Sequence, residues 1–233
     1  MVQEIIPIQL KLPYRMGSVN CYLVKTNTGF ILVDTGSPNN CKELERQLEQ
    51  FGCNSGNIHL IVLTHGDFDH TGNAAYIKKK YDTKIAMHSE DSQIVERGDM
   101  FLNRKKGNFV QSWIVKALFG FSKSQRFKPD LEITDGFDLT EYGLQAKVIH
   151  IPGHSKGSIG ILTVDGKLIC GDLLENTDKI DNPKINSLMD DLETANKSIN
   201  MLKTVEVDIV YPGHGQPFMM KSFLTKLKLN GIK

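Results

Sequence analysis

The spacing of apolar and polar residues predicts alternating strands and helices along most of this 233-residue chain. Short runs rich in β-branched and apolar residues are typical of strands, and they cover residues 5–12, 20–25, 29–33, 58–63, 83–87, 144–151, 158–164, 167–170 and 207–211. Apolar residues that recur every three or four positions predict helices over 38–51, 73–81, 190–204 and 217–229. No low-complexity linker interrupts the chain, which favours one domain over residues 1–233.

Residues 96–130 break this alternation. They carry eight basic residues against three acidic ones, a net charge of +5 in a chain whose overall net charge is +1. Phe109, Trp113 and Ala117 recur at four-residue spacing, which predicts a helix with a broad apolar face. The segment is either a helix packed on the body with a basic outer face or a lid over a site. A lid would favour a substrate with an apolar part and an anionic group.

Side chains able to bind a metal follow the strand at 58–63, in the stretch T-H-G-D-F-D-H. Side chains of an extended chain alternate, so His65 and Asp67 should project the same way. Asp69 and His70 come after the bend and can point to a second place. This geometry suits two adjacent metal ions better than one. The alternative is a solvated polar turn.

Three more residues repeat the pattern of a metal-binding side chain directly after an apolar run. They are His154 in P-G-H-S, Asp172 in C-G-D-L and His214 in P-G-H-G. Each has a glycine beside it, which allows a tight turn or a close approach of the backbone. The repetition strengthens the metal interpretation over that of a solvated turn.

In order and spacing these motifs resemble those of the metallo-β-lactamase-fold hydrolases, whose pattern is T-H-x-H-x-D-H followed by Gly-His, Gly-Asp and Gly-His. Asp34 and Gly36 in V-D-T-G match a further element of that family. The resemblance implies a four-layer αββα sandwich. It also implies a metal-dependent hydrolase that uses a hydroxide held by two metal ions to attack a small ester, thioester or lactone.

The resemblance also assigns roles to individual residues. Asp172 would bridge the two ions, Asp34 would orient a ligand, and Asp69 would also be catalytic by steering the attacking water or accepting its proton. The ligands of the first ion would be His65, Asp67 and His154, and those of the second Asp69, His70 and His214. Tyr14, Arg15, Met16, Trp113 and Lys156 are candidates for the substrate pocket, whereas His59, His88 and His150 are expected to be structural.

One residue departs from the family pattern, because Asp67 stands where the family has histidine. The added negative charge predicts a less Lewis-acidic first metal. The cofactors are therefore expected to be two divalent ions, zinc in the first instance, with iron or manganese also compatible. A carboxylate at this place also resembles the flavodiiron oxygen reductases, so an iron-dependent oxidoreductase of the flavodiiron or persulfide-dioxygenase kind is the alternative function. A non-catalytic metal sensor is disfavoured because all seven ligand positions hold competent donors.

Composition narrows the setting. The four cysteines are scattered without a C-x-x-C motif, which favours free thiols in a reducing compartment. We expect no signal peptide, no membrane span and a cytoplasmic location. A net charge of +1 favours no particular partner. The basic residues of 96–130 are mixed with large apolar ones, which argues against nucleic acid. The expected partner is a small-molecule substrate. The sequence leaves the oligomeric state open.

Overall fold

The computed structural model describes residues 4–102, 104, 121–177 and 181–229. The helix expected from Phe109 to Ala117 lies outside these residues, as do residues 103 and 105–120 of the segment expected to form a lid. Within the described residues, no helix is long and apolar enough to cross a membrane. All four cysteines are free thiols, as the sequence predicts.

The first half of the chain forms a six-stranded sheet in the order β1-β2-β3-β4-β5-β6. The first three strands pair antiparallel, and the remaining ones continue parallel from β3. The strands are β1 (Ile5–Lys11), β2 (Ser18–Lys25), β3 (Phe30–Val33), β4 (Ile58–Val62), β5 (Ile85–His88) and β6 (Leu131–Ile133). The connecting helices are α1 (Cys41–Gln50), α2 (Phe68–Thr71), α3 (Ala74–Tyr81) and α4 (Ser89–Arg97).

The second half forms another sheet, in the order β12-β11-β9-β8-β7, with β10 paired to β9. Its strands are β7 (Ala146–His150), β8 (Ile159–Thr163), β9 (Lys167–Asn176), β10 (Lys184–Ile185), β11 (Ile209–Gly215) and β12 (Phe218–Met219). Its helices are α6 (Leu192–Leu202) and α7 (Met220–Leu229). Short 3₁₀ turns cover Pro13–Arg15, Pro38–Asn40, Lys123–Gln125 and Thr140–Tyr142.

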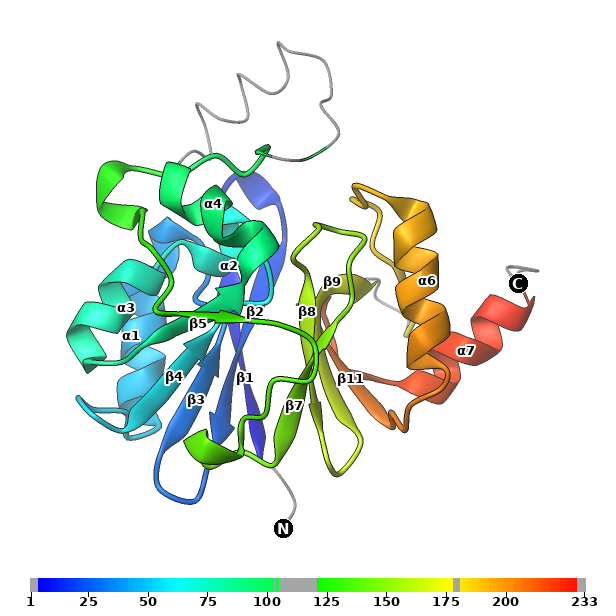
Figure 1. The fold of residues 1–233 in the computed structure, drawn as a ribbon, viewed down its shortest axis with the longest axis horizontal. Coiled ribbons are helices and arrows are strands. Elements are labelled where there is room, and N and C mark those ends of the chain that lie inside the picture. The colour runs from blue at the N-terminus through cyan, green and yellow to red at the C-terminus, as the bar shows by residue number, and fades with distance from the viewer. Residues whose placement is uncertain (1–3, 103, 105–120, 178–180, 230–233) are drawn as a thin grey trace.

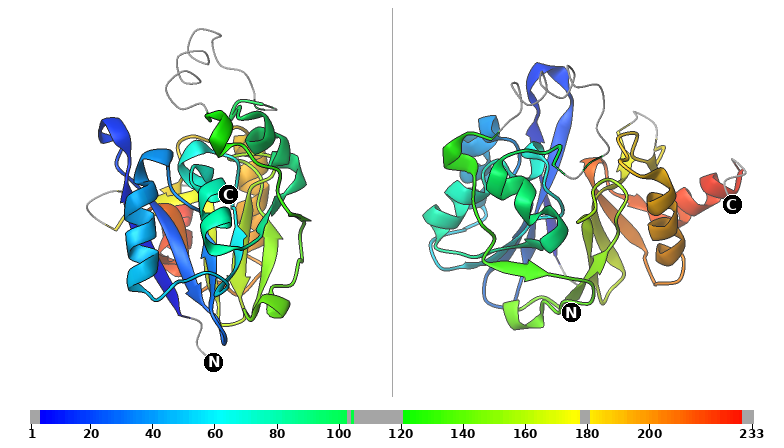
Figure 2. Two further views of the ribbon diagram at one scale, coloured as in Figure 1. Left: turned by 90° about the vertical axis from the view of Figure 1, so that its left-hand side faces the viewer. Right: turned by 45° about the horizontal axis from the view of Figure 1, so that its top comes forward.

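The two sheets pack against each other through a shared core, with helices on the outside of both, as Figures 1 and 2 show. Strand β3 shows how the sequence produces this layering, because successive side chains of a strand point to opposite faces. Leu32 packs into the core shared with α1 and α3. Ile31 and Val33 pack into the core between the sheets. A third core joins the second sheet to α6 and α7. The predicted αββα sandwich is therefore confirmed.

Several predicted boundaries differ from the observed ones. Helix α4, which the sequence did not predict, ends at Arg97, and β6 follows at Leu131 and pairs parallel with β5, so the alternation resumes after the segment between them. Helix α7 begins only at Met220, since Phe218 and Met219 pair with β11 as β12. Strand β9 continues to Asn176 into the stretch expected to be irregular. Phe51 is 41% exposed rather than part of the buried face of α1.

Candidate metal centre

The four metal-capable residues of the T-H-G-D-F-D-H stretch are all buried at the end of β4. His65 lies in the turn after that strand. Asp67 keeps an extended backbone at the N-terminal cap of α2, and the short helix then carries Asp69 and His70. The change from extended chain to helix is the bend that the sequence predicts, and it divides the four side chains into two pairs.

Two groups of potential ligands form where these side chains meet the second half of the chain. Each group offers one ligand atom per residue, and within a group these atoms all lie within 4.8 Å of one another. The first group is His65, His154 and Asp172, and the second is Asp69, His70 and His214. The two groups are adjacent, because the imidazole rings of His65 in the first and His70 in the second have centroids 4.1 Å apart.

Asp172 belongs to the first group and also faces the second. Its Oδ2 atom is 3.2 Å from Nε2 of His214 and 3.9 Å from Nε2 of His154. Its Oδ1 atom is 3.3 Å from Nε2 of His70. One carboxylate thus faces imidazoles of both groups, which is the arrangement a bridging ligand requires.

Hydrogen bonds on the outer side of three rings turn their Nε2 atoms inward. Nδ1 of His70 lies 2.8 Å from Oδ2 of Asp34. Nδ1 of His214 lies 2.8 Å from the carbonyl oxygen of Ser18, to which it donates. Nδ1 of His65 lies 2.9 Å from the hydroxyl of Thr64. Such outer partners fix the tautomer and the orientation of histidine in metal sites.

Asp34 adopts a left-handed backbone conformation, with φ of 60°, directly after β3. Aspartate tolerates this region better than most residues. The carboxylate accepts from both the backbone N–H and the hydroxyl of Thr64, each at 2.8 Å. Asp34 therefore ties the end of β3 to the turn after β4 and to His70 at once.

Glycine is required beside two of the histidines. A Cβ atom on Gly213, the neighbour of His214, would lie 2.1 Å from Oδ1 of Asp172, so any other residue there would displace that carboxylate. Gly153 has φ of 146°, and a Cβ atom there would lie 2.5 Å from that of Ala195 in α6. The backbone approach expected from the sequence is thus present at both places.

The buried donor atoms fit divalent metal ions. Among the described residues, His65 Nε2, His70 Nε2 and Asp172 Oδ1 are buried and make no hydrogen bond of acceptable geometry. Leaving a buried polar atom unsatisfied costs about 1–3 kcal/mol. Imidazole nitrogen and carboxylate oxygen are the usual ligands of zinc, iron and manganese, which would satisfy these atoms.

Burial and mutual charge set the protonation of these side chains. Burial acts to lower the pKa of His214, but the Asp172 carboxylate outweighs it and raises that pKa to about 9. Burial acts to raise the pKa of Asp172, yet His214 and His70 hold it well below its usual range. Asp69 differs, because burial raises its pKa against the opposing effect of His70 and His214. Burial and the neighbouring imidazoles hold the pKa of His65 well below its usual value.

Asp67 makes an additional contact that the sequence does not reveal. Both guanidinium ends of Arg104 pair with its carboxylate, with Nη1 lying 3.2 Å from Oδ2 and Nη2 bound to Oδ1. Burial acts to raise the pKa of Asp67, but Arg104 and His154 outweigh it and hold that pKa below its usual range. The basic segment 96–130 therefore supplies a cation to the site through Arg104.

Asp91, in the first turn of α4, is a second residue that sequence reasoning missed. It is 1% exposed. Its Oδ2 accepts from the backbone N–H of Gly66 at 2.9 Å and the hydroxyl of Ser155 at 2.7 Å, and its Oδ1 accepts from the N–H of Gly157 at 2.9 Å. Gly66 separates His65 from Asp67, and Ser155 follows His154. One buried carboxylate thus joins the ligand turns of the two halves.

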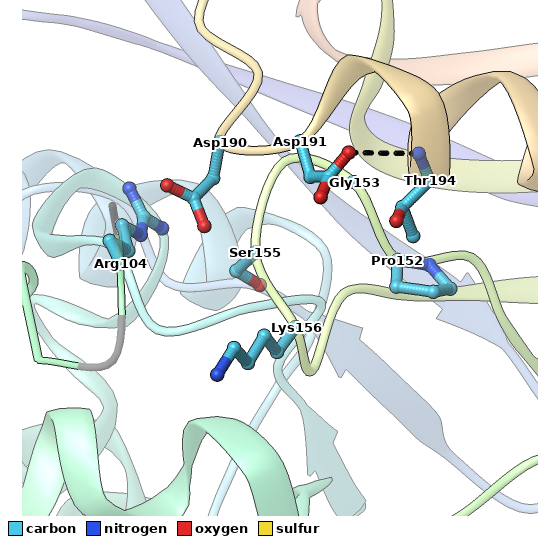
Figure 3. A pocket seen from close by; sticks show the side chains of 8 residues that line it. All are labelled: Arg104, Pro152, Gly153, Ser155, Lys156, Asp190, Asp191 and Thr194. Carbon is cyan, nitrogen blue, oxygen red and sulfur yellow. Dashed lines mark hydrogen bonds between the residues drawn. The ribbon is translucent and has the colours of Figure 1, made fainter.

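A pocket of about 390 Å³ opens beside the His154 turn. Figure 3 shows Arg104 and Lys156 on one side of it, Asp190 near Arg104, and the start of α6 on the other. Its lining residues are Arg104, Pro152, Gly153, Ser155, Lys156, Asp190, Asp191 and Thr194. Among the expected pocket residues, Lys156 therefore lines the pocket. Tyr14 and Met16 are exposed in the β1–β2 connection, and Trp113 lies outside the described residues.

The histidines expected to be structural lie outside the two groups. His88 is the N-terminal cap of α4, where its Nδ1 accepts from the N–H of Glu90 at 3.2 Å, and its ring stacks on His150 with centroids 4.3 Å apart. His59 lies 3.1 Å from the hydroxyl of Thr28. These contacts agree with the expectation.

Relatives of this chain include proteins named as hydrolases. It is 30% identical to a probable metallo-hydrolase of Methanocaldococcus jannaschii, over 85% of this chain and 88% of that protein. It is 27% identical to an acyl-coenzyme A thioesterase of Bos taurus, over 88% of this chain and 76% of the relative. It is 26% identical to a hydroxyacylglutathione hydrolase of Haemophilus influenzae, over 84% of this chain and 85% of the relative.

Solved structures share the fold. A metallo-beta-lactamase family protein of Thermus thermophilus superposes with a TM-score of 0.72 at 22% identity, covering 97% of this chain and 79% of that one. The protein TTHA1623 in a di-iron-bound form superposes with a TM-score of 0.68 at 24% identity, covering 93% and 95%. The model of the metallo-beta-lactamase superfamily matches residues 14–214. The chain therefore belongs to the metallo-beta-lactamase superfamily and is a hydrolytic enzyme.

Proposed function

We propose that this protein is a metal-dependent hydrolase that cleaves a small ester, thioester or lactone at a centre of two divalent ions. The observation that carries the proposal is the pair of buried ligand groups, with Asp172 facing both. His65, Asp67 and His154 would hold the first ion, Asp69, His70 and His214 the second, and Asp172 would bridge them. When bound, two such ions supply a hydroxide nucleophile at neutral pH and stabilise the oxyanion that develops on the substrate.

Asp69 has the chemistry for a catalytic role besides metal binding. Its carboxylate belongs to the second group, and its Oδ2 lies 3.5 Å from Nε2 of His214. Burial raises its pKa, whereas the pKa of Asp172 is held well below its usual range. A carboxylate with a raised pKa accepts a proton more readily, so Asp69 is the better candidate to receive the proton of the attacking water.

The pocket beside His154 supports a small acyl substrate. Its volume of about 390 Å³ lies in the range that holds small ligands. Lys156 offers a cation for an anionic part of the substrate. The relatives named as acyl-coenzyme A thioesterase and hydroxyacylglutathione hydrolase make thioesters the first class to test.

An iron-dependent oxidoreductase is the second candidate. The carboxylate of Asp67 beside His65 and His154 favours it, because two imidazoles and a carboxylate also suit iron(II). The di-iron-bound form of TTHA1623 shows that a protein of this fold accommodates iron. Zinc is the expected ion under the hydrolase proposal.

The deciding experiment measures turnover of a panel of thioesters, esters and lactones with metal-loaded and chelator-treated protein. The hydrolase proposal predicts turnover that depends on the metal and falls at least ~100-fold in Asp69→Asn, within the range that general base catalysis contributes. Asp82→Asn, a change of an exposed aspartate at the end of α3, serves as the matched control. Oxygen uptake in the presence of a thiol or reduced flavin, with no hydrolysis of the panel, would favour the oxidoreductase instead.

A further inference from the structure

Arg104 and Asp67 form a buried, two-pronged ion pair at the edge of the first ligand group. Their side chains are 12% and 9% exposed. The guanidinium presents both Nη atoms to the two carboxylate oxygens. This fork geometry fixes the plane of a carboxylate as well as neutralising it, which a lysine does not do.

The same carboxylate also faces the imidazoles. Oδ2 of Asp67 lies 3.1 Å from Nε2 of His154 and 3.7 Å from Nε2 of His65. Oδ1 is turned to Nη2 of Arg104. Oδ2 therefore faces the ligand group as well as Nη1 of Arg104, whereas Oδ1 faces Nη2, so that binding an ion through Oδ2 would leave the Oδ1 contact in place.

The charges of the pair cancel. In the pattern that this stretch resembles, histidine occupies the position of Asp67, and a neutral imidazole carries no charge to the ion. Aspartate adds one negative charge there, and Arg104 adds one positive charge in direct contact with it. Charges in direct contact interact strongly in a buried site. Removing either residue would therefore leave the charge of the other uncompensated beside the ligand group.

We propose that Asp67 and Arg104 act as one unit that takes the place of a single neutral histidine ligand, with Arg104 as the positioning and charge-compensating residue. The inference rests on the metal centre of the proposed function and deepens it. It also modifies the expectation that Asp67 makes the first ion less Lewis-acidic, because Arg104 offsets most of the added charge. Histidine at position 67 would then be harmful in this chain, although it is the family's own ligand.

The test is a double-mutant cycle that measures metal binding without substrate. Zn²⁺ and Co²⁺ are titrated into wild type, Asp67→His, Arg104→Met and the double variant, with calorimetry for the affinities and the visible spectrum of Co²⁺ for the ligand geometry. Arg97→Met, an exposed arginine in the last turn of α4, is the matched control.

If Asp67 and Arg104 act as one unit, the effects of the two substitutions on metal affinity are not additive. Asp67→His weakens the first ion at least tenfold, because Arg104 then stands uncompensated beside it. Adding Arg104→Met to that variant restores the affinity at least tenfold. In the wild-type background Arg104→Met instead weakens binding of the first ion, because the Asp67 carboxylate loses the contact that fixes its plane. The Co²⁺ spectrum of the double variant returns to a single set of intense visible transitions. Arg97→Met changes neither the metal affinities nor the spectrum.

Two results overturn the proposal. One is Asp67→His binding two ions as tightly as wild type. The other is Arg104→Met changing the affinity by the same factor in the wild-type and Asp67→His backgrounds, which would make Arg104 independent of residue 67. If Asp67→His does not fold, as judged by circular dichroism, Asp67→Asn takes its place in the cycle with the same predictions. Failure of the hydrolase proposal looks different, namely two ions bound by wild type without turnover of the ester panel.

Discussion

Oδ2 of Asp34 lies 2.8 Å from Nδ1 of His70, and the same carboxylate accepts two hydrogen bonds from Thr64. The contact joins the end of one strand to a ligand of the second group. It leaves only Nε2 of His70 free to face Asp172. Asp34 thus fixes the orientation of the His70 ring, although it belongs to neither ligand group.

Asp34→Asn should weaken metal binding about 10- to 100-fold, the usual effect of losing an outer partner of a histidine ligand. The amide has one acceptor oxygen and cannot accept from the Thr64 backbone, the Thr64 hydroxyl and His70 together. Titration with Zn²⁺ measures the effect. Asp82→Asn provides the control, because Asp82 is also an aspartate of positive φ but is exposed. Equal affinities for the two variants would contradict the role of Asp34.

Asp91→Ala should lower both the free energy of unfolding and the affinity for the first ion. Three buried donors lose their acceptor, and each costs about 1–3 kcal/mol when unsatisfied. The turns that carry His65 and His154 also lose their common anchor. Urea denaturation measures the stability, and Zn²⁺ titration measures the affinity. The neighbouring exposed Glu90, changed to Gln, should leave both unchanged. A stability loss with unaltered metal affinity would show that Asp91 only supports the fold.

Gly213→Ala should abolish tight metal binding, because its methyl group would lie 2.1 Å from Oδ1 of Asp172 and must displace the bridging carboxylate. Gly136→Ala separates this steric effect from general glycine loss. Gly136 has positive φ and nothing within 4 Å of an added Cβ, so its substitution strains the backbone by about 1 kcal/mol but leaves the site intact. Elemental analysis of the two purified variants makes the comparison. Full metal content in Gly213→Ala would refute the argument.

The stability of the protein stripped of metal should fall as pH rises from about 6.5 to about 9. The pKa of His214 in the folded protein is raised to about 9 by Asp172. The attraction between the two side chains is therefore fully present at pH values below the pKa of His214 in the unfolded chain. It is lost as the pH rises through the pKa of His214 in the folded protein. Metal must displace this proton, and its affinity should therefore increase over the same pH interval.

Urea denaturation and Zn²⁺ titration at several pH values measure both trends. His214→Gln should flatten each of them in part, with the remainder due to His70, whose pKa is also raised by Asp172 and Asp34. His59→Gln, a change far from both groups, should preserve the wild-type slopes. A stability that rises with pH across this interval would contradict the assignment.

Sequence reasoning could place the ligands because each of them follows an apolar run, and strand ends of a layered fold meet at one edge. It could not find Asp91, because α4 has a polar sequence whose buried face includes Asp91 and Ser92 beside Ile94 and Val95. That face is buried by contacts with distant turns and not by an apolar stripe, so no helical periodicity marks it. Arg104 was one of eight basic residues in segment 96–130, and nothing local distinguishes the one that reaches Asp67.

The most direct test of the account is the metal content of protein purified without added metal or chelator. The account predicts two divalent ions per chain, about one in His214→Gln, and none held tightly in Asp172→Ala, since Asp172 faces both groups. Wild-type protein that contains no stoichiometric metal, and takes up none on titration, would contradict the assignment of all seven ligands.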